Sequence, residues 1–227
     1  MAKERNKREE RRKRPTYQRE EATRDEPGFI LIVCEGKNTE KSYFEGFRLS
    51  HVYVKPVVSG ENTIDVVKRA EILKAGKDYE QVWCVFDKDD FSEERFNEVI
   101  KMANRNRFKV AYSNQAFEYW IVLHLIDHQG ESLHRNFYEE KINENLKSTG
   151  IVYNSDGRKL ITEDLFDFLN SIDPNTNKIR PKLAKTRVEL AIDRAKRNYD
   201  KFSHSDPANE ESSTTVFKLV EELRKYL

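Results

Sequence analysis

The chain has 227 residues, of which 36% are charged and 37% belong to the hydrophobic set. This length fits one large domain or two small ones, and no apolar run approaches the roughly 20 residues that span a bilayer. Two cysteines provide neither a disulfide framework nor a cysteine-based zinc site. We therefore expect a reduced, globular, cytoplasmic protein that does not interact with membranes.

The N-terminal segment differs from the rest of the chain in charge. Residues 1–14 carry eight basic and three acidic side chains, whereas the rest carries 33 basic and 37 acidic ones. No apolar stretch follows, so the segment does not have the pattern of a secretory signal. We expect a disordered basic arm over residues 1–27, which either binds nucleic-acid phosphates through counterion release or only aids solubility. The basic candidates for such contacts are Arg5, Arg8, Arg11, Arg12, Lys13 and Arg14.

Strands and helices are predicted to alternate through the first half of the remaining chain. Continuous apolar runs predict buried strands over 29–34, 52–58, 82–86 and 108–112. Helical spacing predicts a helix after each strand, with Thr39 and Ser92 as caps of the first and third helices and a fourth helix over 115–127. This alternation is typical of βαβ units and of a mostly parallel sheet of about four strands.

The second half of the chain is predicted to be helical. Helical spacing covers 137–147, 160–169 and 181–199, and polar segments such as DPNTNKIRP join these helices. We expect residues 130–200 to form an added helical cap and not a separate domain, and the last helix, within 213–227, to pack back on the sheet. Residues 28–227 would then be one α/β domain with a core over 28–127.

Acidic residues follow two of the predicted buried strands. Glu35 follows the first strand, with Glu40 one turn into the next helix, and Asp87 and Asp89 follow the third strand. Sites in open parallel sheets gather outside the carboxyl ends of the strands. In an extended segment Asp87 and Asp89 point to the same side, and carboxylates held together favour a cation such as Mg²⁺ or Mn²⁺. Acids after a strand are also ordinary loop and cap residues, and either cluster alone favours that interpretation.

These segments carry a resemblance to a known fold and family. The run ILIVCEGKNTEKSYF, followed by VWCVFDKDDF, resembles a Toprim domain, which has a Glu after its first strand and an Asp-x-Asp after its third. The runs SNQAFEYWIVLHL and STTVFKLVEEL resemble the RloB family of Toprim-like proteins. That family is associated with bacterial phage defence and abortive infection, alongside the AbiL system. The resemblance covers roughly residues 28 to 227 and leaves out the basic arm.

The resemblance assigns residues to the motifs of the family. Glu35 matches the Toprim glutamate, and Asp87 and Asp89 match its aspartate pair. Glu40 matches the second acid of the first RloB motif, one residue further along than in overcoming-lysogenization nucleases, which leaves its role as a ligand open. The third RloB motif is matched by Asn114, Glu118 and His124, whose roles the resemblance does not assign.

These residue types suit the cleavage of a phosphodiester bond. Two divalent metals can stabilise the attacking and the leaving oxygen. Asp87 and Asp89 would hold the metals, Glu35 would ligate a metal or act as general base or acid, and Glu118 would be a further ligand. Lys37 would contact the scissile phosphate or remain a solvated turn lysine.

Several other residues favour a structural interpretation. His124 and His128 are four residues apart, but the HExxH pattern is absent, which favours a core role for His124 over a zinc ligand. Cys34 and Cys84 lie in apolar strands and should behave as small hydrophobic residues. Tyr112 is expected to pack rather than to stack on a base. The basic stretch over 180–197 fits a solvated face of mixed charge better than a nucleic-acid face.

Two functions from different classes follow from these patterns. The first is a metal-dependent nuclease that cleaves RNA such as tRNA, or DNA, as an effector of antiviral defence, using Mg²⁺ or Mn²⁺. The second is a non-catalytic Toprim-like subunit that binds nucleic acid or a partner in a complex with an ATPase. The sequence has no P-loop motif, so such an ATPase would be a separate chain. A primase or topoisomerase component is disfavoured by the length of the chain.

Overall fold

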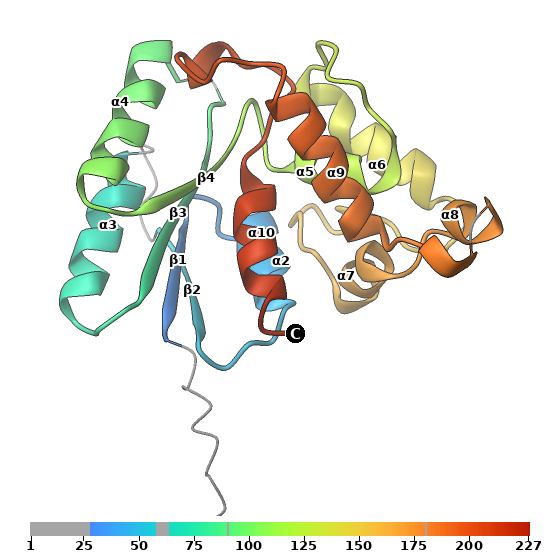
Figure 1. Cartoon of the computed structure of the whole chain (residues 1–227), viewed down its shortest axis with the longest axis horizontal. Coiled ribbons are helices and arrows are strands. Elements are labelled where there is room, and N and C mark those ends of the chain that lie inside the picture. Colours follow the sequence, from blue (N-terminus) through green and yellow to red (C-terminus); the bar gives the residue numbers. More distant parts are fainter. Residues whose placement is uncertain (1–27, 58–63, 90, 180) are drawn as a thin grey trace, which may run out of the picture.

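The computed structural model describes residues 28–57, 64–89, 91–179 and 181–227 of the chain (Figure 1). The expected basic arm over 1–27, with its six candidate phosphate contacts, lies outside the described residues. Within the described part, no helix combines the length and the apolar character that crossing a membrane requires.

A sheet of four parallel strands, in the order β2-β1-β3-β4, forms the centre of the fold. The strands are β1 (Ile30–Cys34), β2 (Val52–Pro56), β3 (Gln81–Asp87) and β4 (Lys109–Ser113). β1 lies between β2 and β3 and all its residues are buried, which explains why its sequence is apolar without alternation. The structure thus confirms the predicted α/β fold with a parallel sheet.

Helices cover both faces of this sheet (Figure 1). One face is covered by α3 (Ile64–Ala75) and α4 (Glu93–Arg105), and the other by α2 (Thr39–Glu45), α5 (Glu118–Leu125) and α10 (Val216–Arg224). Alternate residues of β1 belong to two separate hydrophobic clusters, one on each face. The last helix therefore packs on the sheet as predicted, and a backbone bond from Thr215 to the Tyr112 carbonyl ties its start to β4.

The helices of the second half extend the cluster around α5 rather than the sheet. They are α6 (Tyr138–Leu146), α7 (Glu163–Asn170), α8 (Pro174–Ile179) and α9 (Arg187–Tyr199), with short 3₁₀ turns η1 (Arg135–Phe137), η2 (Pro181–Leu183) and η3 (Pro207–Asn209). Buried residues of α6, α7 and α9 share one hydrophobic cluster with α5 and with one face of the sheet.

Several local predictions were wrong, for identifiable reasons. α5 begins at Glu118 instead of residue 115, because Gln115 has a positive φ of 85° that no α-helix accommodates. Thr39 is the first helical residue and not the cap; its hydroxyl donates to the Lys159 carbonyl instead. The polar segment DPNTNKIRP contains the helix α8, and the helix expected over 181–199 is split into η2 and α9 by a capping box at Thr186.

Candidate carboxylate site at the sheet edge

Glu35 and Asp87 meet at the carboxyl ends of the two central strands. Cys34 pairs with Val85 across β1 and β3, and the Glu35 amide donates to the Val85 carbonyl at 2.9 Å. The Asp87 amide donates to Glu35 Oε2 at 3.3 Å. Two residues from separate motifs are thus adjacent, because parallel strands end at the same edge of the sheet.

Asp87 is held at the N-terminus of α5. Its Oδ2 accepts the Phe117 amide at 3.0 Å, where the helix end stabilises negative charge. Its Oδ1 is buried and has no hydrogen-bond partner among the described residues. Burial raises the pKa of Asp87 well above its ordinary value, repulsion from Glu40 and Glu118 adds to this, and the Phe117 amide opposes it.

Glu40 lies under the turn that follows β1. Only 6% of it is exposed, and its carboxylate lies so close to Gly36 that a Cβ at that position would collide with it. Burial raises the pKa of Glu40 to about 7, with smaller contributions from Glu118 and Glu35, while backbone hydrogen bonds from Glu40 and Gly36 act in the opposite direction. A glycine at position 36 is therefore needed for the carboxylate to sit there.

Glu118 is the first residue of α5 and is 8% exposed. Its Oε1 accepts the Tyr153 hydroxyl at 2.9 Å and lies 3.2 Å from Lys159 Nζ. The charge of Glu118 contributes to the raised pKa of both Asp87 and Glu40, and Glu35 contacts Asp87. We call Glu35, Glu40, Asp87 and Glu118 the carboxylate cluster.

Asp89 does not extend the cluster in the way the sequence predicted. β3 ends at Asp87, and Asp89 lies in a turn with a positive φ of 44°. The expectation that residues 87–89 are extended and present two carboxylates on the same side is therefore wrong. The chain turns because the amides of Lys88 and Asp89 bond to the carbonyls of Ser113 and Gln115. The exposed Asp89 carboxylate forms an ion pair with Arg135.

The remaining motif positions lie around the cluster. Lys37 is exposed in the turn between β1 and α2. Asn114 donates to the carbonyls of Pro207 and Ala208, which fixes the segment before α10 against β4. Through these contacts, Asn114 holds that segment in place.

His124 lies in the core and not in a zinc site. It is fully buried, donates its Nδ1–H to the Trp120 carbonyl at 2.8 Å, and burial lowers its pKa to about 3. His128 lies beyond the end of α5 and pairs with the Tyr119 hydroxyl, so the expected helical spacing of the two histidines does not exist. The structure agrees with the core interpretation of His124.

The other residues considered from the sequence are also structural. Cys34 and Cys84 are buried, and desolvation raises the pKa of both thiols, to about 12 for Cys84. Tyr112 is buried and its hydroxyl donates to Glu210 at 3.1 Å. These positions agree with the packing roles that the sequence suggested.

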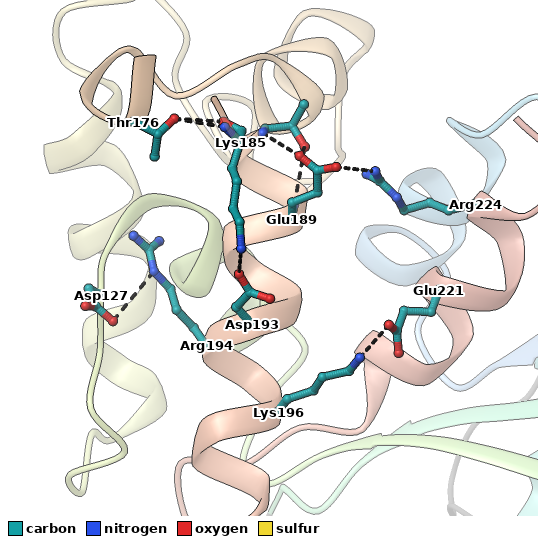
Figure 2. A network of polar contacts seen from close by, with 10 residues as sticks. Asp127, Thr176, Lys185, Glu189, Asp193, Arg194, Lys196, Glu221 and Arg224 are labelled. Carbon is teal, nitrogen blue, oxygen red and sulfur yellow. Dashed lines mark hydrogen bonds and ion pairs between the residues drawn. The ribbon is translucent and has the colours of Figure 1, made fainter. Parts of the chain in front are cut away.

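The charges of the predicted mixed-charge face pair with one another (Figure 2). On and around α9, Lys185 pairs with Asp193, Lys196 with Glu221, Arg224 with Glu189, and Arg194 with Asp127. A groove of about 910 Å³ lies between α9 and α10 and is lined by several of these residues. Such a face fits a solvated surface better than a site for a phosphate backbone.

The carboxylate cluster fits a hard divalent cation in its chemistry. All its side-chain ligands are oxygens, which Mg²⁺ and Mn²⁺ prefer, and Asp87 Oδ1 is buried without a hydrogen-bond partner among the described residues. Burial, with repulsion from the neighbouring carboxylates as a smaller cause, raises the pKa of Asp87 and Glu40. In the described part of the chain, no three Asp, Glu, His or Cys side chains are arranged to hold an ion as they stand. Ion binding would therefore require these side chains to turn.

Three contacts of the site had no signal in the sequence. Tyr153 and Lys159 reach Glu118 from the helical segment, 35 and 41 residues away along the chain. Arg135 reaches Asp89 in the same way. Neither periodicity nor a local motif marks these residues, since their role depends on how the helical segment packs.

Comparison with models of known protein families identifies one family that matches this chain. The model of the family described as RloB-like protein matches residues 30–223, a range that contains the carboxylate cluster and the motif positions Asn114 and His124. No match was found among curated proteins or among solved structures. The chain belongs to the RloB-like protein family.

Proposed function

We propose that this protein is a cytoplasmic, metal-dependent nuclease that cleaves phosphodiester bonds in RNA such as tRNA, or in DNA. The observation that carries this proposal is the carboxylate cluster, whose four acidic side chains come from the turn after β1 and from α2, β3 and α5, with Glu35 and Asp87 in contact at the edge of a parallel sheet. Its role in bacterial antiviral defence rests on the association of RloB-like proteins with such systems.

Each residue of the site has a role in this proposal. Glu35, Asp87 and Glu118 would hold Mg²⁺ or Mn²⁺, with Glu40 and Asp89 as further ligands. The bound ion would stabilise charge on the phosphoryl oxygens and lower the pKa of a water molecule. Glu35 would also serve as general acid or base, and Lys37 would contact the phosphate from the exposed turn. Residues 28–227 would act as one domain, in which the helical segment over 130–200 supplies Tyr153 and Lys159 to Glu118.

The raised pKa values fit this role. Burial raises the pKa of Asp87 and Glu40 and repulsion among the carboxylates adds to it, and a divalent cation among them would offset that repulsion. The Phe117 amide at the N-terminus of α5 bonds one oxygen of Asp87, and its other oxygen, Oδ1, is left to contact an ion.

A cleavage assay tests the proposal. The purified chain is incubated with plasmid DNA, single-stranded DNA and total tRNA, with Mg²⁺, Mn²⁺ or EDTA. We expect cleavage that needs the metal and falls at least about 100-fold in Glu35→Gln and in Asp87→Asn. Asp193→Asn is the matched control, because that acid lies in the paired network of α9, and it should cleave like the unchanged chain. Cleavage that survives both substitutions would rule out this site.

A second candidate is a binding subunit without catalytic activity, in a complex with a separate ATPase. It is favoured by the ion pairs that Asp89 and Glu118 form with Arg135 and Lys159, and by the lack of a preformed ion site among the described residues. The same assay separates the two functions. Nucleic acid or a partner that binds without being cleaved, with and without that ATPase, would favour the second candidate.

A further inference from the structure

A cavity of about 400 Å³ lies directly beside the carboxylate cluster. Glu118 forms part of its wall, and the helical segment supplies the rest through η1, the start of α6, and Lys159. The cavity therefore opens next to the side chains to which the proposed function assigns the chemistry.

Hydrogen-bond donors dominate the wall of this cavity. Arg135 and Lys159 are cationic and half-exposed, and Asn136 adds an amide. Tyr138 is also among the lining residues, but its hydroxyl is buried and adds no donor on the open wall. Of the two lining carboxylates, Glu118 accepts from Tyr153 and Lys159, and Glu139 accepts from Asn154. Two cations and an amide on one wall fit an anionic ligand.

We propose that Arg135 and Lys159 bind the phosphate backbone of one nucleic-acid strand in this cavity and so position it against the carboxylate cluster. The inference rests on the proposed function and adds the residues that hold the substrate. A cluster of four carboxylates repels a phosphodiester, so a nuclease built on it needs cations at its border.

The two cations differ in how they can reach a phosphate. The side chains of Arg135 and Asp89 are 32% and 41% exposed, and an ion pair at such exposure contributes little stability, so a phosphate can replace Asp89 as the partner of Arg135. The side chain of Lys159 is 48% exposed but that of its partner Glu118 is only 10% exposed, so the ammonium would keep this contact and use its remaining donors on the phosphate. A guanidinium can bind two phosphate oxygens at once, and the lysine ammonium adds a point charge.

A single strand suits this cavity better than a duplex. A strand in a loop or at an end can bend toward a recess of about 400 Å³, whereas a regular helix holds its phosphates at fixed positions. Phosphate contacts of this kind fix position and carry no base preference. We therefore expect RNA and DNA strands of the same sequence to bind through the same two cations.

Binding measurements on the full chain test this inference. Fluorescence anisotropy is recorded with a labelled single-stranded RNA, the matching DNA strand and the RNA duplex, in EDTA and again with Ca²⁺. We expect Arg135→Gln and Lys159→Met each to raise Kd for the strands about three- to tenfold, and the double variant to lower the slope of log Kd against log salt by roughly 1.4. The duplex should bind less tightly than the strands, and its Kd should change less in these variants.

The matched control is Arg158→Gln. Arg158 is the neighbour of Lys159, is exposed, pairs with Asp156 and does not line the cavity. Arg158→Gln removes the same charge as each single test variant and should change Kd less than twofold. Lys159→Arg keeps the charge and should retain binding, which separates the effect of charge from a change in folding.

Two outcomes would overturn the inference. One is a double variant with the Kd and salt slope of Arg158→Gln, and the other is an unchanged chain that binds neither strand. The result is distinguishable from failure of the proposed function. If Glu35→Gln abolishes cleavage while the double variant binds normally, the nuclease stands and the inference falls. If the double variant loses binding while the unchanged chain never cleaves, the binding site stands and the nuclease falls.

Discussion

The sheet edge and the α9–α10 face are both rich in charge, but they differ in how the charges are compensated. On the α9–α10 face, exposed acids and bases pair with one another around a groove of about 910 Å³ (Figure 2). At the sheet edge, Glu40 and Glu118 are buried near Asp87, whose Oδ1 has no partner among the described residues. Exposed ion pairs lose little hydration and contribute little stability. Carboxylates buried close together are unfavourable when ionised, unless a proton, a cation or a functional requirement accounts for them. Burial of several carboxylates close together, with one oxygen of Asp87 left without a partner among the described residues, marks the candidate site better than the size of a groove does.

The pH dependence of stability should show this difference most strongly. Since burial raises the pKa of Glu40 from 4.5 to about 7, the folded chain binds more protons than the unfolded chain between these values. The free energy of unfolding should therefore fall as the pH rises through this window, by up to about 3 kcal/mol. Thermal unfolding in EDTA, from about pH 5 to about pH 8, measures it.

A variant without the titrating group is the control for this experiment. In Glu40→Gln the unfolding free energy should depend less on pH. The pH dependence that remains is due to Asp87, whose pKa is also raised. Stability that increases with pH across the window, or an equal slope in the variant, would contradict the account of the cluster.

Gly36→Ala should disturb the cluster without a change of charge. The new Cβ would meet the buried Glu40 carboxylate, so the variant should lose about 1–3 kcal/mol of unfolding free energy. Gly76→Ala is a matched control, because a Cβ there meets only the Leu73 carbonyl at 3.6 Å. Chemical denaturation of both variants tests the prediction, which fails if the two lose the same stability.

The smallest effect is expected on the α9–α10 face. Lys185→Gln removes an ion pair with Asp193 in which both side chains are about half exposed, so stability should change by less than about 0.5 kcal/mol. The change should vanish at high salt, which screens exposed pairs. A loss as large as that of Gly36→Ala would mean that the two regions do not differ as we describe.

The sequence predicted those parts of the site that depend on local pattern. Apolar runs located β1 and β3, and the geometry of parallel strands then brought Glu35 next to Asp87. The sequence did not predict those parts of the site that depend on a single backbone dihedral or on a contact between residues far apart in the chain. The positive φ of Asp89 turns its carboxylate away from an extended path, and no pattern announces that Lys159 reaches Glu118 across 41 residues. Period-two alternation applies only while the strand continues, and packing of the helical segment has no local signature.

Metal-dependent cleavage requires the carboxylate cluster to bind a divalent cation, and calorimetric titration with Mn²⁺ tests this most directly. We predict binding by the unchanged chain and by Asp193→Asn, and at least about tenfold weaker binding by Asp87→Asn and Glu35→Gln, since each loses an anionic ligand. Equal affinity in all four proteins, or no binding by the unchanged chain, would contradict it.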